Sequence, residues 1–162
     1  MSQTVRLVFD TAVLVAAIRS DTGASRRLLR AALERRHGLT LLVSVPLLIE
    51  YEAVMTRAEH LRASGLSAAD VGVLLDAVAE VAEPAQLTYL WRPALADVDD
   101  DMVLEAAVNV RAEAIVTFNL RDFVSAAAHF GIAVMSSGEA VSDWRRGHEK
   151  KQLCPAAPAI SP

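Results

Sequence analysis

The sequence lacks several features that would define common protein classes. It has one cysteine, Cys154, which excludes an internal disulfide and a thiolate metal cluster. No uncharged hydrophobic run reaches the roughly 18–20 residues of a membrane span, and the first residues lack the basic region of a signal peptide. Lysine is scarce, because fourteen of the 16 basic residues are arginine. These absences favour a soluble cytoplasmic protein that does not contact a membrane.

Motifs for covalent catalysis and for P-loop chemistry are absent as well. The chain contains no Gly-x-Ser-x-Gly nucleophile motif and no P-loop glycine pattern. Its four histidines lie near expected helix ends or in the C-terminal tail, and they form no Cys–His pair: His37, His60, His129 and His148. Any chemistry is therefore expected to depend on acidic side chains.

The hydrophobic pattern alternates between short strands and helices. At 162 residues, of which 53% are hydrophobic, the chain is long enough for one domain with a single core. Strands are expected at 5–9, 39–44, 86–91, 113–118 and 131–136, and helices at 12–18, 24–36, 45–56, 67–82, 99–111 and after Ser136. This alternation predicts an α/β fold with a parallel sheet and helices on both sides. We expect a domain over 1–144 and a disordered tail over 145–162.

Acidic and amide side chains follow several of the expected strands. They are Asp10 after the first strand, Glu50 in the helix after the second, the cluster Asp97, Asp99, Asp100 and Asp101 at a later helix start, and Asn119 with Asp122 after the fourth strand. Ligands of parallel sheets bind beyond the carboxyl ends of the strands. Each residue also has a simpler explanation: Asp10 or Asp99 as a helix cap, and Glu50 as a surface charge.

The number of aspartates favours a site over caps alone. One helix needs one cap, whereas four aspartates within five residues repel one another unless water or a cation neutralises them. Oxygen ligands without thiolates or convergent histidines select hard divalent ions such as Mg²⁺ or Mn²⁺. Sites of this kind carry out phosphodiester hydrolysis.

Three segments resemble the motifs of a known family. They are "VFDTAVLVAAI", "LLIEYEAVMTR" and "DVDDDMVLEAAVNVRAEAIVTFNLRDF", and their order and spacing resemble PIN-domain ribonucleases, in particular the VapC-like toxins of bacterial toxin–antitoxin pairs. The resemblance covers roughly residues 5–140. It implies a PIN-like three-layer α/β sandwich, in which helices flank a central parallel sheet of about five strands. It also implies an acidic pocket for Mg²⁺ or Mn²⁺, an RNA substrate and a cognate antitoxin protein.

The resemblance assigns roles by position. Asp10, Glu50 and Asp100 match the metal ligands, and Asn119 matches a fourth catalytic position. Asp100 is chosen because it lies eleven residues before Arg111, where the family usually has glycine. Four further residues are expected to support these ligands without binding the metal: Thr11, Asp97, Thr117 and Asp122.

The sequence departs from the family pattern at two positions. Ala12 stands where the family usually has asparagine, and Asn119 stands where it often has aspartate. Because Asn119 lowers the charge of the site by one, we expect one tightly held ion rather than two. These departures keep open a catalytically weak or inactive PIN-fold module that binds RNA or a partner protein. A phosphatase is less well supported, because it would show an Asp-x-Asp pair where Ala12 stands.

A cluster of arginines is a candidate for binding the RNA backbone. Arg19, Arg26, Arg27 and Arg30 lie in or near the helix expected at 24–36. A solvated helix face explains them equally well.

The helices at 45–63 and 67–82 also carry apolar surface. We assign most of it to the core, and the alternatives are an interface with a partner protein or a homodimer.

Taken together, these features make an endoribonuclease that leaves a 5′-phosphate and a 3′-hydroxyl the leading hypothesis.

Overall fold

The computed structural model describes residues 4–34, 38–87 and 98–153. Within these ranges the chain forms one five-stranded sheet in the order β3-β2-β1-β4-β5, and all of its pairings are parallel. The strands are β1 (Val5–Phe9), β2 (Leu39–Val43), β3 (Glu83–Pro84), β4 (Ala114–Val116) and β5 (Ala133–Met135). The expected α/β sandwich with a central parallel sheet of about five strands is confirmed.

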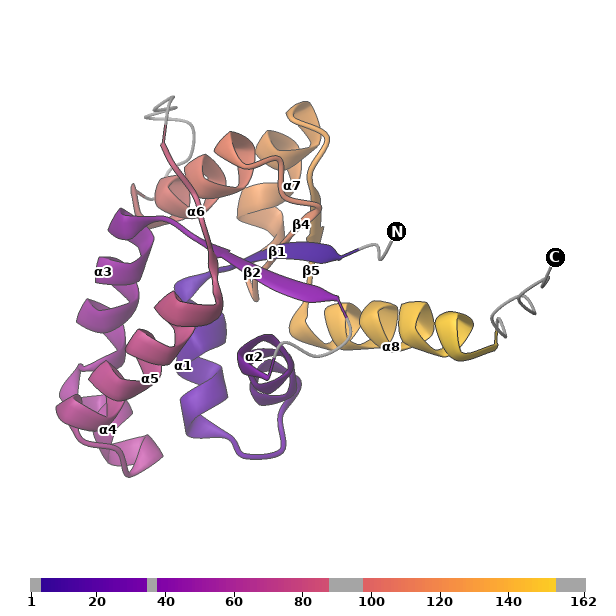
Figure 1. Cartoon of the computed structure of the whole chain (residues 1–162). Helices are drawn as coiled ribbons and strands as arrows, with labels where there is room; N and C mark the ends of the chain where they lie inside the picture. The colour runs from indigo at the N-terminus through magenta and orange to yellow at the C-terminus, as the bar shows by residue number, and fades with distance from the viewer. Residues whose placement is uncertain (1–3, 35–37, 88–97, 154–162) are drawn as a thin grey trace, which may run out of the picture.

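Helices cover both faces of this sheet. In the described ranges they are α1 (Thr11–Arg19), α2 (Ala24–Leu33), α3 (Val45–Met55), α4 (Ala58–Ser64), α5 (Ala68–Val81), α6 (Val98–Asn109), α7 (Leu120–His129) and α8 (Ser137–Leu153). Figure 1 shows α6 and α7 above the sheet and α1, α2, α5 and α8 below it. No described helix combines the length and the hydrophobicity that a membrane-spanning helix needs.

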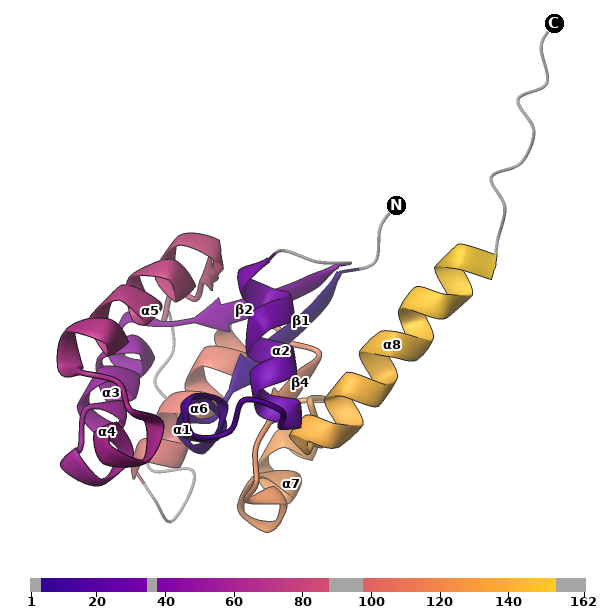
Figure 2. The ribbon, with the colours of Figure 1, turned by 90° about the horizontal axis from the view of Figure 1, so that it is seen from below.

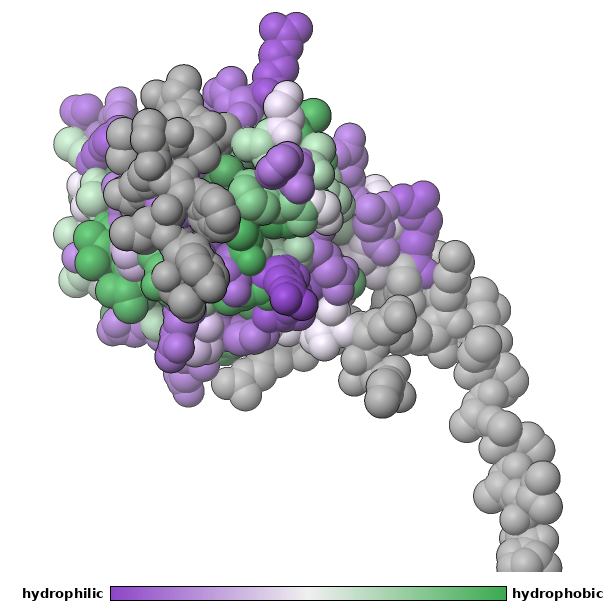
Figure 3. Space-filling model, turned by 90° about the horizontal axis from the view of Figure 1, so that it is seen from above, coloured by the Kyte–Doolittle hydropathy of each residue, from purple (hydrophilic) through white to green (hydrophobic). Residues whose placement is uncertain are grey.

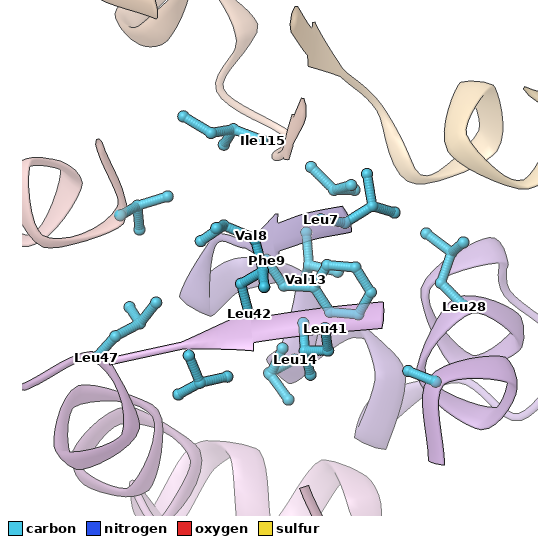
Figure 4. Close-up of a cluster of buried hydrophobic side chains, with 14 of the residues drawn as sticks. Leu7, Val8, Phe9, Val13, Leu14, Leu28, Leu41, Leu42, Leu47 and Ile115 are labelled. Atoms are coloured by element: carbon cyan, nitrogen blue, oxygen red, sulfur yellow. The ribbon is translucent and has the colours of Figure 1, made fainter. Parts of the chain in front are cut away.

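The core lies on both sides of the central strand. Leu7, Val8 and Phe9 of β1 are each at most 1% exposed, as expected for a parallel strand with helices on both faces. Residues of β2, α1 and α2 surround them (Figure 4). Because β1 is the middle strand, the residue that follows it sits at the centre of the carboxyl edge.

Two of the expected helix starts are confirmed at atomic detail. Ser67 and Asp70 form a reciprocal capping box at the start of α5. Before α8, the backbone N–H of Ser136 donates to Glu139 at 3.0 Å and that of Glu139 donates to the Ser136 hydroxyl at 3.2 Å. Such caps satisfy backbone groups that the first helical turn leaves without partners.

Three expectations about elements need correction. The strand expected at 86–91 is wrong for Gln86 and Leu87, which belong to no strand, and residues 88–91 lie outside the described ranges. The observed strand is β3, where Pro84 is tolerated because β3 is at the edge of the sheet. Helix α7 was not expected. Helix α8 continues to Leu153, so the expected disorder does not begin at 145; residues 154–162 lie outside the described ranges.

Candidate active site

The ends of β1 and β4 bring Asp10 and Thr117 together. These strands pair in parallel with Phe9 opposite Val116, and the backbone N–H of Asp10 donates to the Val116 carbonyl at 2.9 Å. The hydroxyl of Thr117, a residue with no exposed surface, donates to Asp10 Oδ2 at 2.7 Å. A residue separated from Asp10 by most of the chain thus holds its carboxylate in place.

Asp10 does not cap α1 with its side chain. It occupies the N-cap position, but its carboxylate makes no hydrogen bond to the first turn of the helix. Asp10 is 8% exposed, and burying a carboxylate is costly without compensating interactions. Its place at the carboxyl edge, bonded to Thr117, therefore matches a functional carboxylate better than a plain cap.

Helices α3 and α6 bring two further carboxylates to the same edge. The Ser44 hydroxyl caps α3 by accepting from the Leu47 N–H at 3.2 Å, and this fixes the start of the helix that carries Glu50. Asp100, in the first turn of α6, is 8% exposed. Glu50 and Asp100 line a pocket of about 420 Å³ together with Asp10. Three carboxylates from distant parts of the chain therefore share one pocket.

This pocket fits a hard divalent ion in the chemistry of its donors. Among the described residues, no three acidic, histidine or cysteine side chains are close enough to form a ready-made metal cluster. Mg²⁺ does not need one, because it keeps several waters and takes only one or two protein carboxylates. The oxygen donors of Asp10, Glu50 and Asp100 suit that coordination, and their partial burial strengthens their attraction to a cation.

Asn119 also lines the pocket, and Asp122 holds its side chain. Asn119 Nδ2 donates to Asp122 Oδ2 at 2.6 Å, and the Asn119 backbone N–H donates to the Thr117 hydroxyl at 2.9 Å. With the amide nitrogen engaged, the amide oxygen is the group that Asn119 can offer to a ligand. Asp122 itself is exposed and does not line the pocket.

The other members of the aspartate cluster have different positions. Asp97 lies outside the described residues, and for Asp99 only the backbone, in α6, is described. Asp101 is 1% exposed and does not line the pocket. Asp100 was singled out by its spacing to Arg111, a position where the family usually has glycine. The structure agrees with that position, because Arg111 has a φ of 51°, in the left-handed region that favours glycine.

The arginines expected to bind RNA do not form one surface at the pocket. Arg19 Nη1 lies 3.5 Å from Nδ1 of His60, a pocket residue. Arg26 donates to the Ala17 carbonyl and forms an ion pair with Asp21 at 3.1 Å. Arg27 and Arg30 line a separate cavity between α2 and α8. Arg19 is therefore linked to the pocket through His60, whereas the contacts given for the other three arginines are to residues outside it.

The structure adds pocket residues that the sequence analysis did not select. Arg57, His60 and Phe118 line the pocket. They lie there beside Thr11, which the sequence analysis did expect. The period of α3 gave no signal for Arg57, because that helix ends at Met55 and Arg57 is the N-cap residue of the next one. Phe118 stands just beyond the end of β4, between Thr117 and Asn119, two residues that the sequence analysis did select.

Tyr51 connects the pocket to the core. It has no exposed surface, and its hydroxyl donates to the backbone carbonyl of Phe9, directly before Asp10. Burial, and then the negative charge of Asp10, raise the pKa of the Tyr51 phenol well above its usual value. Tyr51 therefore stays protonated and anchors α3 to the end of β1.

Comparison with known proteins gives one family. The sequence matches the PIN domain family over residues 6–121, a range that includes Asp10, Glu50, Asp100 and Asn119. No curated protein matches the chain.

Proposed function

Because the chain belongs to the PIN-domain family, whose members are generally nucleases, we propose that it is an endoribonuclease dependent on Mg²⁺ or Mn²⁺. One observation carries the proposal: Asp10, Glu50 and Asp100, from three separate elements, line a single pocket at the carboxyl edge of the sheet. That edge is where parallel α/β sheets bind their ligands.

The residues of the pocket would have distinct roles in hydrolysis. Asp10, Glu50 and Asp100 would hold the ion, and Thr117 would keep Asp10 in position. When bound, the ion supplies Lewis-acid activation of water and stabilises charge at the phosphate. The Asn119 amide oxygen would orient the attacking water. Hydrolysis forms a bond from the water oxygen to phosphorus and breaks the bond to the 3′ oxygen, which leaves a 5′-phosphate and a 3′-hydroxyl.

The finer part of the proposal concerns the biological role. The resemblance of the motifs to VapC-like toxins supports a toxin that a cognate antitoxin protein holds inactive, with cellular RNA as its target. Such a protein would act in the cytoplasm. The proposal includes a homodimer as a form in which such a protein could act.

The test combines cleavage with metal binding. Purified wild type, Asp10→Asn and Asp100→Asn are incubated with an RNA pool and Mn²⁺ or Mg²⁺, and the new RNA ends are identified by their reactivity to phosphatase and ligase. Calorimetry measures Mn²⁺ binding in parallel. Asp76→Asn is the matched control, because Asp76 is an exposed acid on α5 that lies away from the pocket.

The proposal expects metal-dependent cleavage in the wild type and in Asp76→Asn, with a loss of at least about 100-fold in both pocket variants. Metal binding without cleavage of any RNA would support the alternative of an inactive PIN-fold module. Cleavage that persists in EDTA, or in both pocket variants, would overturn the assignment of these carboxylates.

A further inference from the structure

The pocket has a second set of side chains beside the carboxylates. Phe118, Arg57 and His60 line it, together with the apolar side chains of Val15 and Val54. A metal site alone needs neither an aromatic ring nor a cation. Both are suited to a nucleic-acid strand, which offers flat bases and phosphates at regular intervals.

Phe118 is held rigidly at the rim of the pocket. The backbone on its N-terminal side is fixed by the Thr117 N–H, which donates to the Met135 carbonyl at 3.0 Å. On its C-terminal side the Asn119 N–H donates to the Thr117 hydroxyl at 2.9 Å. Thr117 points inward to Asp10, whereas Phe118 is 57% exposed. The ring is therefore presented to solvent between two residues of the proposed active site.

Exposure alone would not distinguish Phe118. Other large apolar side chains are exposed as well, such as Val73 at 70% and Val124 at 51%, and Figure 3 shows hydrophobic residues among hydrophilic ones on the surface. Neither valine lies in this pocket. Phe118 differs because it is aromatic and because it borders the carboxylates.

Arg57 supplies a positive charge that no described carboxylate neutralises. It is exposed, it sits at the corner between α3 and α4 as the N-cap residue of α4, and its side chain forms no salt bridge with the described residues. Glu50 and Val54 lie one turn apart on α3, Arg57 follows just beyond the end of that helix, and all three line the same pocket. His60, by contrast, already contacts Arg19 and Glu59.

We propose that Phe118 and Arg57 together hold one unpaired nucleotide of the RNA next to the cleavage position, with its base on the Phe118 ring and its phosphate on the Arg57 guanidinium. This inference rests on the proposed ribonuclease function and deepens it. A base can stack on a side chain only when it is unpaired. A guanidinium binds a phosphate through paired hydrogen bonds. The pocket thereby selects a single-stranded region of RNA.

The binding test uses a fluorescently labelled single-stranded RNA and fluorescence anisotropy in EDTA, so that cleavage cannot occur. Phe118→Ala and Phe118→Leu should each raise the Kd about tenfold, whereas Phe118→Trp should stay within about threefold of wild type, since stacking needs the ring rather than its hydrophobicity. The matched control is Val124→Ala. The blunt-ended duplex of the same sequence should bind at least about tenfold more weakly to the wild type.

For Arg57 the informative quantity is the salt dependence of binding. Arg57→Gln should make the slope of log Kd against log salt shallower by about 0.7, the value for one phosphate contact on a single strand, and Arg57→Lys should restore it. Arg62→Gln is the control, because Arg62 is an exposed arginine of α4 that lies outside the pocket. A merely structural role would not change this slope.

Kinetics with Mn²⁺ distinguish this inference from the proposed function. If the wild type cleaves RNA, Phe118→Ala and Arg57→Gln should raise KM and leave kcat within about threefold. An unchanged KM in both variants, equal binding of the duplex, or an unchanged salt slope in Arg57→Gln would overturn the inference. If the wild type cleaves no RNA, the proposed function fails, while the anisotropy series still decides whether Phe118 and Arg57 bind an unpaired nucleotide.

Discussion

At the end of β1, Asp10 accepts a hydrogen bond from Thr117 and none from the first turn of the helix that it precedes. Thr117 is buried and also accepts the backbone N–H of Asn119, so one hydroxyl positions two residues of the pocket. Groups that orient metal ligands affect metal affinity nearly as strongly as some ligands do. Thr117 is therefore expected to matter although it is not one of the carboxylates proposed to hold the metal.

Replacement of Thr117 by valine keeps the shape of the side chain and removes both hydrogen bonds. We expect Thr117→Val to weaken Mn²⁺ binding about 10- to 100-fold in calorimetry, because the Asp10 carboxylate is no longer fixed. Thr117→Ser should recover most of the affinity. Equal affinity in wild type and Thr117→Val would show that Asp10 is positioned without this bond.

Tyr51 predicts a change of stability at alkaline pH. Its pKa is raised above the usual value near 10, first by burial and then by the charge of Asp10. As the pH rises above about 10, the unfolded chain releases the phenol proton before the folded chain does. Tyr51 therefore contributes fully to the free energy of unfolding when the pH is below the pKa of the phenol in the unfolded chain. Above that pH the free energy of unfolding falls by up to about 1.4 kcal/mol per pH unit.

Urea unfolding of wild type and Tyr51→Phe between pH 8 and 10.5 measures this effect. At pH 8 the variant should be about 1–3 kcal/mol less stable, because the buried Phe9 carbonyl loses its donor. Above pH 10 the difference between the two proteins should shrink. Parallel pH profiles would mean that Tyr51 ionises equally in the folded and unfolded chains.

The candidate site could be predicted from sequence where polar side chains follow strands and match the family motifs. Asp10, Glu50 and Asp100 stand out as acidic residues near strand ends, the family motif singles out Asp100 among its neighbours, and the structure brings the three to one pocket. Phe118 and Tyr51 are apolar or aromatic, so in sequence they resemble core residues. Only the folded structure shows that Phe118 faces solvent while Tyr51 lies wholly in the interior.

At the level of elements, the periodic segments were predictable and the short ones were not. The expected range of α5, 67–82, agrees with Ala68–Val81 because the helix is long and has a capping box. Strand β3 has two residues and exists because Glu83 and Pro84 pair with β2 at the sheet edge, an interaction that local sequence does not encode. Helix α7 buries only Phe123 and Ala127, one turn apart, and these two residues alone did not lead to a predicted helix.

The capping box of α5 gives a prediction about stability. The Ser67 hydroxyl accepts the Asp70 N–H at 3.1 Å, and the Ser67 N–H donates to the Asp70 carboxylate at 2.9 Å. Ser67→Ala should lower the free energy of unfolding by about 1 kcal/mol. Urea unfolding measures it, with Ser125→Ala in the exposed part of α7 as a control that should change little. A loss in Ser67→Ala no larger than in the control would contradict this role of the cap.

At the scale of the whole molecule, the fold extends beyond the part that matches the family. The match ends at residue 121, whereas β5 extends the sheet beside β4 and α8 packs against α2. A buried hydrogen bond of 2.8 Å joins Ser25 of α2 to Ser137 of α8. Seen from below, the start of α8 lies beside α2 and the rest of the helix extends away from the body (Figure 2). The carboxyl end of β5 still reaches the site, because the Met135 carbonyl accepts the Thr117 N–H at 3.0 Å.

The stability of the whole fold should respond to the metal through the carboxylate pocket. Asp10, Glu50 and Asp100 come from elements that are adjacent only in the folded chain, so an ion bound among them stabilises the folded state over the unfolded one. At a concentration about 100 times its Kd, Mn²⁺ should add about 2.7 kcal/mol. For a protein of this size that raises Tm by roughly 5–10 °C.

Differential scanning fluorimetry with and without Mn²⁺, at matched ionic strength, measures this shift. It should be absent or much reduced in Asp10→Asn and preserved in Asp76→Asn, which removes one exposed negative charge outside the pocket. Because both variants lose the same formal charge, the comparison separates a specific site from general attraction of the ion to an acidic protein. An equal shift in the two variants would place the stabilising ion somewhere other than beside Asp10.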